Sequence, residues 1–391
     1  MRPSGVLVSG DRGGKDGPSG ARERRSTPKD RDRSTPAFLI LAEGQFGPLT
    51  SKTANSCIRY TPERVRGVID SRRAGKTAND ILGFGGDIPV LASIDEGLSM
   101  SPTALLIGIA PQGGRLPEEW RTTIRRAIEH GMDIWSGLHT FVSDDRELRE
   151  LAERHGVAIH DLRRPPKNLP VAGGRVRTVD ATVVLTVGAD CNIGKMTAAL
   201  QMRDGLTERG HRVAFAGTGQ TGILIDGGGI AVDAVIADFI AGAAEQLVLD
   251  SARDADIVLV EGQGSVIHPG YSGVTLGLIH GSLPHAMVMC HQPSRTHVTN
   301  NPWVKLPPLS DLIELHEALV RHLRPAPVIA VSLNTYDLSE RKAKSAIKAI
   351  ERETGLPTTD PVRFDPAPVV EAIDRFHRKR KRATSRRAAR R

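Results

Sequence analysis

Cysteine is scarce in this chain, with three residues in 391, and aromatic side chains make up only 4% of it. Cys57, Cys191 and Cys290 show no spacing typical of a metal or redox site, and their odd number argues against a disulfide framework. Proteins without structural disulfides are typical of reducing compartments. We therefore expect a cytoplasmic protein that folds without disulfide bonds.

Long apolar runs are also missing. The chain has no stretch of about 18 consecutive apolar residues, the length that a membrane-spanning helix needs. The first residues, MRPSGVLVSGDRGG, lack the apolar core of a secretory signal peptide. We expect no membrane partner, and these absences agree with a cytoplasmic location.

The formal net charge is +8, but the positive charge is concentrated at the two ends. The last fifteen residues, HRKRKRATSRRAARR, hold nine Lys or Arg and no acidic residue, and the first 35 hold nine basic and five acidic residues. The part between them therefore carries a net charge of −5. Charged runs with little apolar content are typical of disordered segments. We predict disorder over residues 1–35 and 377–391, and we expect no nucleic-acid partner despite the basic tail.

Apolar strands alternate with amphipathic helices over the rest of the chain. Buried strands are indicated by AFLILAEG, TALLIGIA, ATVVLTV and PVIAVSLN, and helices that end at glycine by PEEWRTTIRRAIEHG and SERKAKSAIKAIERETG. Such alternation favours mostly parallel sheets. We predict an α/β fold of two domains. A Rossmann-like parallel sheet occupies residues 36–165, a linker rich in Pro and Gly follows over 166–180, and a P-loop NTPase-type doubly wound sheet occupies 181–376.

The sequence GADCNIGKMT lies between the strand ATVVLTV and a helix. A phosphate-binding loop has the form G-x-x-x-x-G-K-[ST], whereas five residues separate Gly188 from Gly194 here. The backbone N–H groups of such a turn and the N-terminus of the helix attract phosphate, and Lys195 adds a positive charge. We predict that this loop binds an oligophosphate.

The longer loop resembles that of dethiobiotin synthetase and its relatives in the deviant-Walker branch of P-loop proteins. Those proteins share an acidic residue two positions after the first glycine, where Asp190 stands here. In that branch a second acidic residue ends a distant strand and helps to hold magnesium, and Glu261 in VLVEGQGS fits this place. A buried carboxylate is costly unless it is paired, which favours a functional role for Glu261.

The usual magnesium ligand is missing from the loop. A Ser or Thr follows the lysine in P-loop proteins and coordinates the ion, but Met196 stands at this position. Thr197 can replace that hydroxyl only if the helix begins one residue later. Thr197 and Glu261 are therefore expected as metal ligands only if the protein uses Mg-ATP.

A second group of polar residues follows VLVE. It contains five histidines: His268, His280, His285, His291 and His297. Their spacing matches no zinc pattern, and we predict that they lie in loops after strands. His268 or His280 can contact a substrate or accept its proton, and Arg295 can bind a substrate carboxylate with two parallel hydrogen bonds. Asn334 precedes Asp337 by three residues at the end of a later strand, a spacing with which some P-loop proteins read a nucleotide base.

Several motifs in order resemble the D-glutamate N-acetyltransferase family. They include KTANSCIRY, IGIAPQGGRLPEEW, DIWSGLHTF, GADCNIGKMTAAL, VEGQGSVIHPGYSGVTLGLIHG and CHQPSRTH, and the resemblance spans roughly residues 37–375. It implies a Rossmann-like domain joined to a P-loop domain. It also implies an enzyme of D-amino-acid metabolism that moves an acetyl group from acetyl-CoA to the amino group of D-glutamate or a related D-amino acid.

On this resemblance the loop holds the phosphates of acetyl-CoA. The expected cofactor-binding residues are Gly188, Asp190, Asn192, Gly194, Lys195, Met196, Thr197 and Asn334. We expect His268 or Glu261 to act as the catalytic base and Arg295 to bind the carboxylate of the amino-acid substrate.

Two other functions stay open from the sequence. One is an ATP- and magnesium-dependent ligase that resembles dethiobiotin synthetase, in which Lys195 and Glu261 serve Mg-ATP. The other is a non-catalytic nucleotide-binding protein. The sequence also leaves open whether the chain forms a homo-oligomer.

Overall fold

The computed structural model describes residues 35–109 and 116–388, and those from Pro36 onward belong to one compact unit. The disorder predicted for residues 1–35 falls almost entirely outside the described residues. Within the described ranges no helix is both long enough and apolar enough to cross a bilayer.

The first sheet has six parallel strands in the order β3-β2-β1-β4-β5-β6. This order is that of the Rossmann fold. The strands are β1 Phe38–Leu41, β2 Val65–Ile69, β3 Val90–Leu91, β4 Ala104–Ile107, β5 Asp133–Ser136 and β6 Ile159–Asp161. The helices around it are α1 Lys52–Tyr60, α2 Ala78–Leu82, α3 Ile94–Leu98, α4 Glu118–Glu129 and α5 Arg146–His155. The prediction of a Rossmann-like parallel sheet is confirmed.

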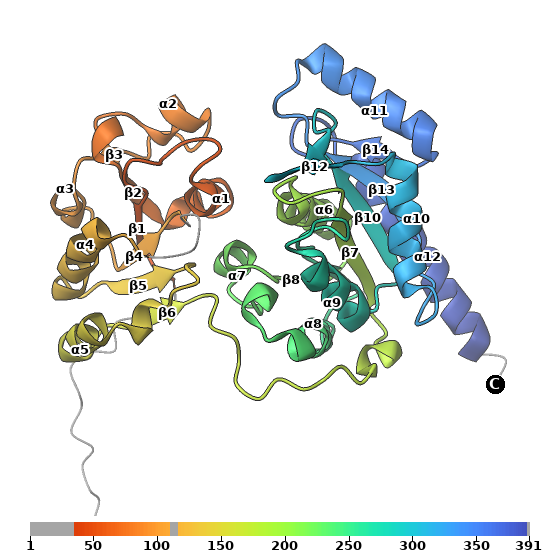
Figure 1. Ribbon diagram of the computed structural model, residues 1–391, viewed down its shortest axis with the longest axis horizontal. Coiled ribbons are helices and arrows are strands. Elements are labelled where there is room, and N and C mark those ends of the chain that lie inside the picture. Colours follow the sequence, from red (N-terminus) through yellow and green to blue (C-terminus); the bar gives the residue numbers. More distant parts are fainter. Residues whose placement is uncertain (1–34, 110–115, 389–391) are drawn as a thin grey trace, which may run out of the picture. The chain divides into compact units, whose positions relative to one another are not determined.

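The second sheet also has six parallel strands, in the order β14-β13-β10-β7-β9-β8. Strands β14, β13, β10, β7 and β8 of this sheet are labelled in Figure 1. The six strands are β7 Thr182–Gly188, β8 Val213–Ala216, β9 Ile257–Val260, β10 Ala286–His291, β13 Val328–Leu333 and β14 Thr358–Thr359. A separate hairpin consists of β11 His297–Val298 and β12 Asn301–Lys305. All seven residues of β7 are buried, as expected for an apolar run in a sheet covered on both faces.

Helices cover the second sheet in two groups. The first is α6 Lys195–Glu208 with α12 Ala367–Ala388, and the second is α8 Ala237–Ser251, α9 Ser272–Ser282 and α10 Leu309–Val320. The right-handed crossover rule places the two groups on opposite faces. Two further helices are α7 Gln220–Asp226 and α11 Glu340–Thr354. The central strand β7 pairs with β10 on one side and β9 on the other, so the carboxyl ends of these strands form the crevice where doubly wound sheets bind ligands.

The end of the chain differs from the sequence prediction. Residues 377–388 are the last part of α12, so the prediction of a disordered tail is wrong for them, and only 389–391 lie outside the described residues. Helix α12 is anchored to the sheet because His377 Nδ1 lies 2.8 Å from the hydroxyl of Thr182 and Arg380 donates to the carbonyl of Asp180 at 2.7 Å. The sequence of the charged run does not indicate these contacts, because their partners lie 195 and 200 positions earlier in the chain.

Helix α9 is a second difference. The sequence predicts loops for the histidines after Glu261, but His280 lies in α9, where its Nε2 contacts the carbonyl of Leu319 in α10 at 3.0 Å. His280 therefore joins two helices, and it does not line the crevice as a loop residue.

Candidate functional site

The segment from Gly188 to Gly194 connects β7 to α6 in a tight turn. Gly194 has a φ of 98°, a left-handed conformation that strongly favours glycine, and Asn192 also has a positive φ of 53°. The helix begins at Lys195 immediately after this turn. Asn334, which follows β13, flanks the loop, because a Cβ built on Gly194 would lie 3.9 Å from its side chain. The backbone therefore has the form of a phosphate loop.

Lys195 is buried and points back into the loop. Its Nζ donates a hydrogen bond to the carbonyl of Asp190 at 2.6 Å, and burial lowers its pKa. A glycine at position 262 leaves room for this side chain, since a Cβ there would lie 3.1 Å from Lys195 Cδ and 1.7 Å from the carbonyl of Thr186. A buried ammonium group with one carbonyl partner can exchange that contact for an anion.

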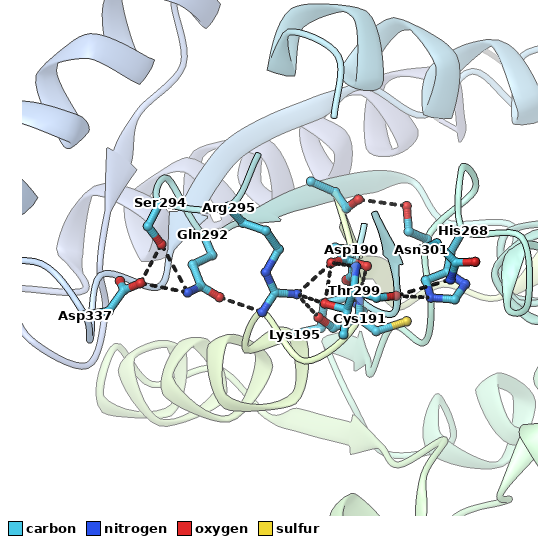
Figure 2. A network of polar contacts seen from close by, with 12 residues as sticks. Asp190, Cys191, Lys195, His268, Gln292, Ser294, Arg295, Thr299, Asn301 and Asp337 are labelled. Atoms are coloured by element: carbon cyan, nitrogen blue, oxygen red, sulfur yellow. Dashed lines mark hydrogen bonds and ion pairs between the residues drawn. The ribbon is translucent and has the colours of Figure 1, made fainter. Parts of the chain in front are cut away.

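The carboxylate of Asp190 is fully buried and saturated with protein donors (Figure 2). Its Oδ2 accepts from Arg295 Nη1 at 2.7 Å, from Thr299 N at 2.8 Å and from Thr299 Oγ1 at 2.7 Å, and its Oδ1 accepts from Cys191 N at 2.7 Å. Burial on its own would raise the pKa of Asp190, but the hydrogen bonds from Thr299 and Arg295 hold it below its usual value. Asp190 is therefore a charged anchor for Arg295 and for the hairpin that carries Thr299.

Arg295 extends this network towards the end of β13 (Figure 2). Its Nη2 donates to Gln292 Oε1 at 2.8 Å, and Gln292 Nε2 donates to Asp337 Oδ2 at 3.1 Å. Ser294 Oγ donates to the same oxygen of Asp337 at 2.5 Å. The chain of contacts joins the phosphate loop to the neighbourhood of Asn334. The expectation that Arg295 binds a substrate carboxylate stays a prediction, since its guanidinium pairs with a carboxylate of the protein.

Glu261 directly follows β9 and is buried. Its Oε2 accepts hydrogen bonds from the backbone N–H groups of Thr218 at 2.9 Å and Gly219 at 3.1 Å, just before α7. Burial raises the pKa of Glu261. The partner that a buried carboxylate requires is thus supplied by two backbone donors at the start of α7.

Thr197 does not take the place of the hydroxyl residue that follows the lysine in P-loop proteins and coordinates magnesium. Because α6 begins at Lys195, Met196 and Thr197 are its second and third residues, and successive helical residues point about 100° apart. Met196 is packed in the core of the second domain. The later helix start that would bring Thr197 to the position of the missing hydroxyl does not occur.

His268 lies beside the loop. Its Nδ1 accepts from Gly270 N at 3.1 Å, so Nε2 is the protonated nitrogen that donates to the carbonyl of Thr299 at 3.2 Å. Ligand atoms of Asp190, Cys191 and His268 lie within 4.8 Å of one another and could surround a metal ion. However, the polar atoms of Asp190 and His268 already have protein partners. The structure places His268 near the loop and His280 elsewhere.

His285 is also outside this cluster. It accepts from Val183 N at 3.0 Å and contacts Arg324 at 3.2 Å, and burial lowers its pKa to about 3. It is a neutral hydrogen-bonding residue at the start of β10. Of the five histidines, His268 is the one with atoms close to Asp190 and Cys191 among the residues that the structure describes.

Sequence reasoning missed Thr299 and Gln292. Thr299 stands in the turn between β11 and β12, and neither this hairpin nor its contact with Asp190 leaves a periodic pattern in the sequence. The motif CHQPSRTH contains Gln292 and Arg295, and its density of polar residues directly after a buried strand was the available signal.

Two parallel α/β sheets, the second with a glycine-bordered loop after its central strand, define a two-domain protein of the Rossmann and P-loop classes. The chain belongs to the DUF1611 family. The P-loop domain of that family (described as a domain of unknown function, DUF1611_C) matches residues 170–370, and its Rossmann-like domain (DUF1611_N) matches residues 71–165.

Two relatives carry the name D-glutamate N-acetyltransferase. The protein from Tritonibacter scottomollicae is 39% identical over 341 residues, which cover 87% of this chain and 98% of that protein. The protein from a Pseudoalteromonas species is 39% identical over 272 residues, covering 69% of this chain and 81% of that protein. A crystal structure of a DUF1611 family protein from Anabaena variabilis is also 39% identical, with a TM-score of 0.84, and covers 87% of this chain and 100% of that one. The chain is an acyltransferase, of the N-acetyltransferase type.

Proposed function

We propose that this enzyme transfers the acetyl group of acetyl-CoA to the amino group of D-glutamate or a related D-amino acid. The names of the two relatives support the reaction. The observation that carries the choice of cofactor is the saturated carboxylate of Asp190, which has protein donors on both oxygens. A loop whose acidic residue is already neutralised suits a polyphosphate that arrives without a metal, and CoA contains such a diphosphate.

The loop would hold the diphosphate in the manner of a P-loop. The backbone N–H groups between Gly188 and Gly194 and the start of α6 supply donors, and Lys195 would move its ammonium group from the carbonyl of Asp190 to a phosphate oxygen. Asn334 beside Gly194, with Asp337 three residues later, would face the adenine. An amide and a carboxylate suit the exocyclic amine and ring nitrogens of that base.

Acetyl transfer needs a base. The amine nitrogen attacks the thioester carbon, the C–S bond breaks, CoA leaves as the thiol, and the amine gives up a proton. Both His268 and Glu261 are buried and hydrogen-bonded. We favour His268 for this proton because its ring lies within 4.8 Å of ligand atoms of Asp190 and Cys191 in the loop. His268 would have to release one of its two hydrogen bonds on substrate binding.

The test offers the purified enzyme D-glutamate with acetyl-CoA in one tube and with Mg-ATP in another. Release of free thiol that depends on D-glutamate and persists in EDTA supports the proposal. Release of ADP without thiol would support the Mg-ATP ligase instead. L-Glutamate in place of D-glutamate is the control for the stereochemistry of the acceptor.

A further inference from the structure

Three oxygen atoms converge on one nitrogen of Arg295 (Figure 2). Asp190 Oδ2 lies 2.7 Å from Nη1, and the carbonyl oxygen of Cys191 and the hydroxyl oxygen of Thr299 each lie 2.6 Å from it. Nη1 carries two hydrogens, so three acceptors cannot each receive a separate linear hydrogen bond. At least two acceptors therefore share one hydrogen, and three oxygens surround a single positively charged group.

This oxygen shell resembles the ligand sets of hard metal ions. A carboxylate, a backbone carbonyl and a hydroxyl are the ligand types that Ca²⁺ and Mg²⁺ take, at about 2.3–2.6 Å and about 2.0–2.1 Å respectively. The oxygens of Asp190 and Cys191 belong to the phosphate loop, and the hydroxyl of Thr299 belongs to the hairpin. Without a positive charge at this point, the buried carboxylate of Asp190 would lose its main counterion.

We propose that Arg295 is the built-in cation of the phosphate loop and takes the place that a metal ion would otherwise fill. Its charge is permanent, and it is fixed by Asp190 on one side and by Gln292 on the other. The loop then binds a polyphosphate that carries no metal. A magnesium ion bound to the phosphates would be repelled by the positive charge of Arg295. Arg295 is in this account a specificity-determining residue for CoA over Mg-nucleotides.

Two N–H groups of the Arg295 guanidinium are available for a ligand. Nε–H and the second N–H of Nη2 have no acceptor among the residues that the structure describes, and the side chain is 20% exposed. Either group can reach out to a phosphate oxygen while Nη1 stays on Asp190. This step rests on the proposed function, because it assumes that the loop holds the phosphates of CoA.

The experiment replaces the built-in cation with an added one. In Arg295→Ala we expect CoA to bind about 30-fold or more weakly, as for the loss of one partner of a buried charge pair. Guanidinium chloride, at concentrations far below those that unfold the protein, should restore much of this affinity, and Ca²⁺ or Mg²⁺ should do so in part. Arg295→Lys should keep binding independent of added cations. Binding is measured by calorimetry, and folding by circular dichroism.

The control is Arg175→Ala. Arg175 pairs with the buried Glu245 at 3.1 Å and also contacts Gln246, neither of which belongs to the phosphate loop, and CoA binding by this variant should not respond to added cations. The proposal is overturned if folded Arg295→Ala binds CoA as tightly as the wild type, or if it binds weakly and no cation restores binding. Since binding is the measurement, a wild type that binds CoA but releases no thiol would count against the proposed reaction alone.

Discussion

Asp190 and Arg295 form an ion pair of 2.7 Å across 105 positions of the chain. The pair fastens the segment after β10 to the phosphate loop after β7, and Thr299 adds two hydrogen bonds to the same carboxylate oxygen. Asp190, which stands at the position of the acidic residue of deviant-Walker loops, thus already accepts hydrogen bonds from Arg295 and Thr299. On the proposed function, this relationship favours a phosphate that arrives without a metal over Mg-ATP.

Asp190→Asn tests the charge of this anchor. The hydrogen bonds from Thr299 and Arg295 outweigh burial and lower the pKa of Asp190 in the folded protein. The stabilisation is therefore present above the unfolded pKa of about 3.9 and is lost as the pH falls through the folded pKa. We expect the variant to lose about 3 kcal/mol of stability near neutral pH. The difference from the wild type should shrink below about pH 4, as measured by denaturant unfolding at several pH values. A difference that does not change with pH would argue against a charged Asp190.

The affinity for CoA should depend on the protonation of Lys195. Burial lowers the pKa of Lys195 in the free protein, and a bound phosphate would raise it again. Above the pKa of the free protein, binding then takes up a proton, so the dissociation constant should rise with pH in that range, by up to about tenfold per pH unit. Calorimetry in buffers of different ionisation enthalpy measures the proton uptake. Lys195→Arg, whose charge does not titrate, should show no such dependence, and equal proton uptake by both proteins would contradict this role.

His268→Gln separates a catalytic base from a structural contact. Glutamine can still donate to the carbonyl of Thr299, as Nε2 of His268 does at 3.2 Å, but it cannot accept a proton. We expect kcat to fall about 10²–10⁴-fold, with little change in the affinity for CoA. The matched control is His280→Gln, which keeps a donor to the carbonyl of Leu319 between two helices and should keep its activity. Near-normal turnover by His268→Gln would leave the histidine with a structural role only.

Two truncations test the anchoring of α12. Removal of residues 377–391 deletes the contact of His377 with Thr182 and that of Arg380 with Asp180, and should lower the melting temperature by about 4 °C or more. Removal of residues 384–391 leaves both contacts in place and should have little effect. Differential scanning calorimetry of the two proteins makes the comparison. Equal melting temperatures would contradict the anchoring of α12 through His377 and Arg380.

The phosphate loop could be predicted because it is local. It consists of a buried strand, a turn with Gly188 and Gly194, and a helix that starts at Lys195. These elements follow one another in the chain, so consecutive residues determine their geometry. The place of Glu261 at the end of β9 is local in the same sense.

The partners of these residues could not be predicted in this way. Thr299 reaches Asp190 from a hairpin 109 positions later, and no short-range pattern records such a contact. The basic end of the chain has the composition of a disordered tail, but Val369, Val370 and Ile373 are buried earlier in the same helix. That buried face and the contact of His377 with Thr182 allow the helix to continue into the charge run.

The most direct measurement is the initial rate of free-thiol release from acetyl-CoA and D-glutamate in EDTA, for the wild type and Lys195→Ala. Lys344→Ala, which removes an exposed lysine paired with Glu340 on α11, is the control. The account predicts thiol release by the wild type and the control, with a loss of about 100-fold or more in Lys195→Ala. Thiol release that needs a divalent metal, or that is unchanged in Lys195→Ala, would contradict a phosphate loop that holds CoA without one.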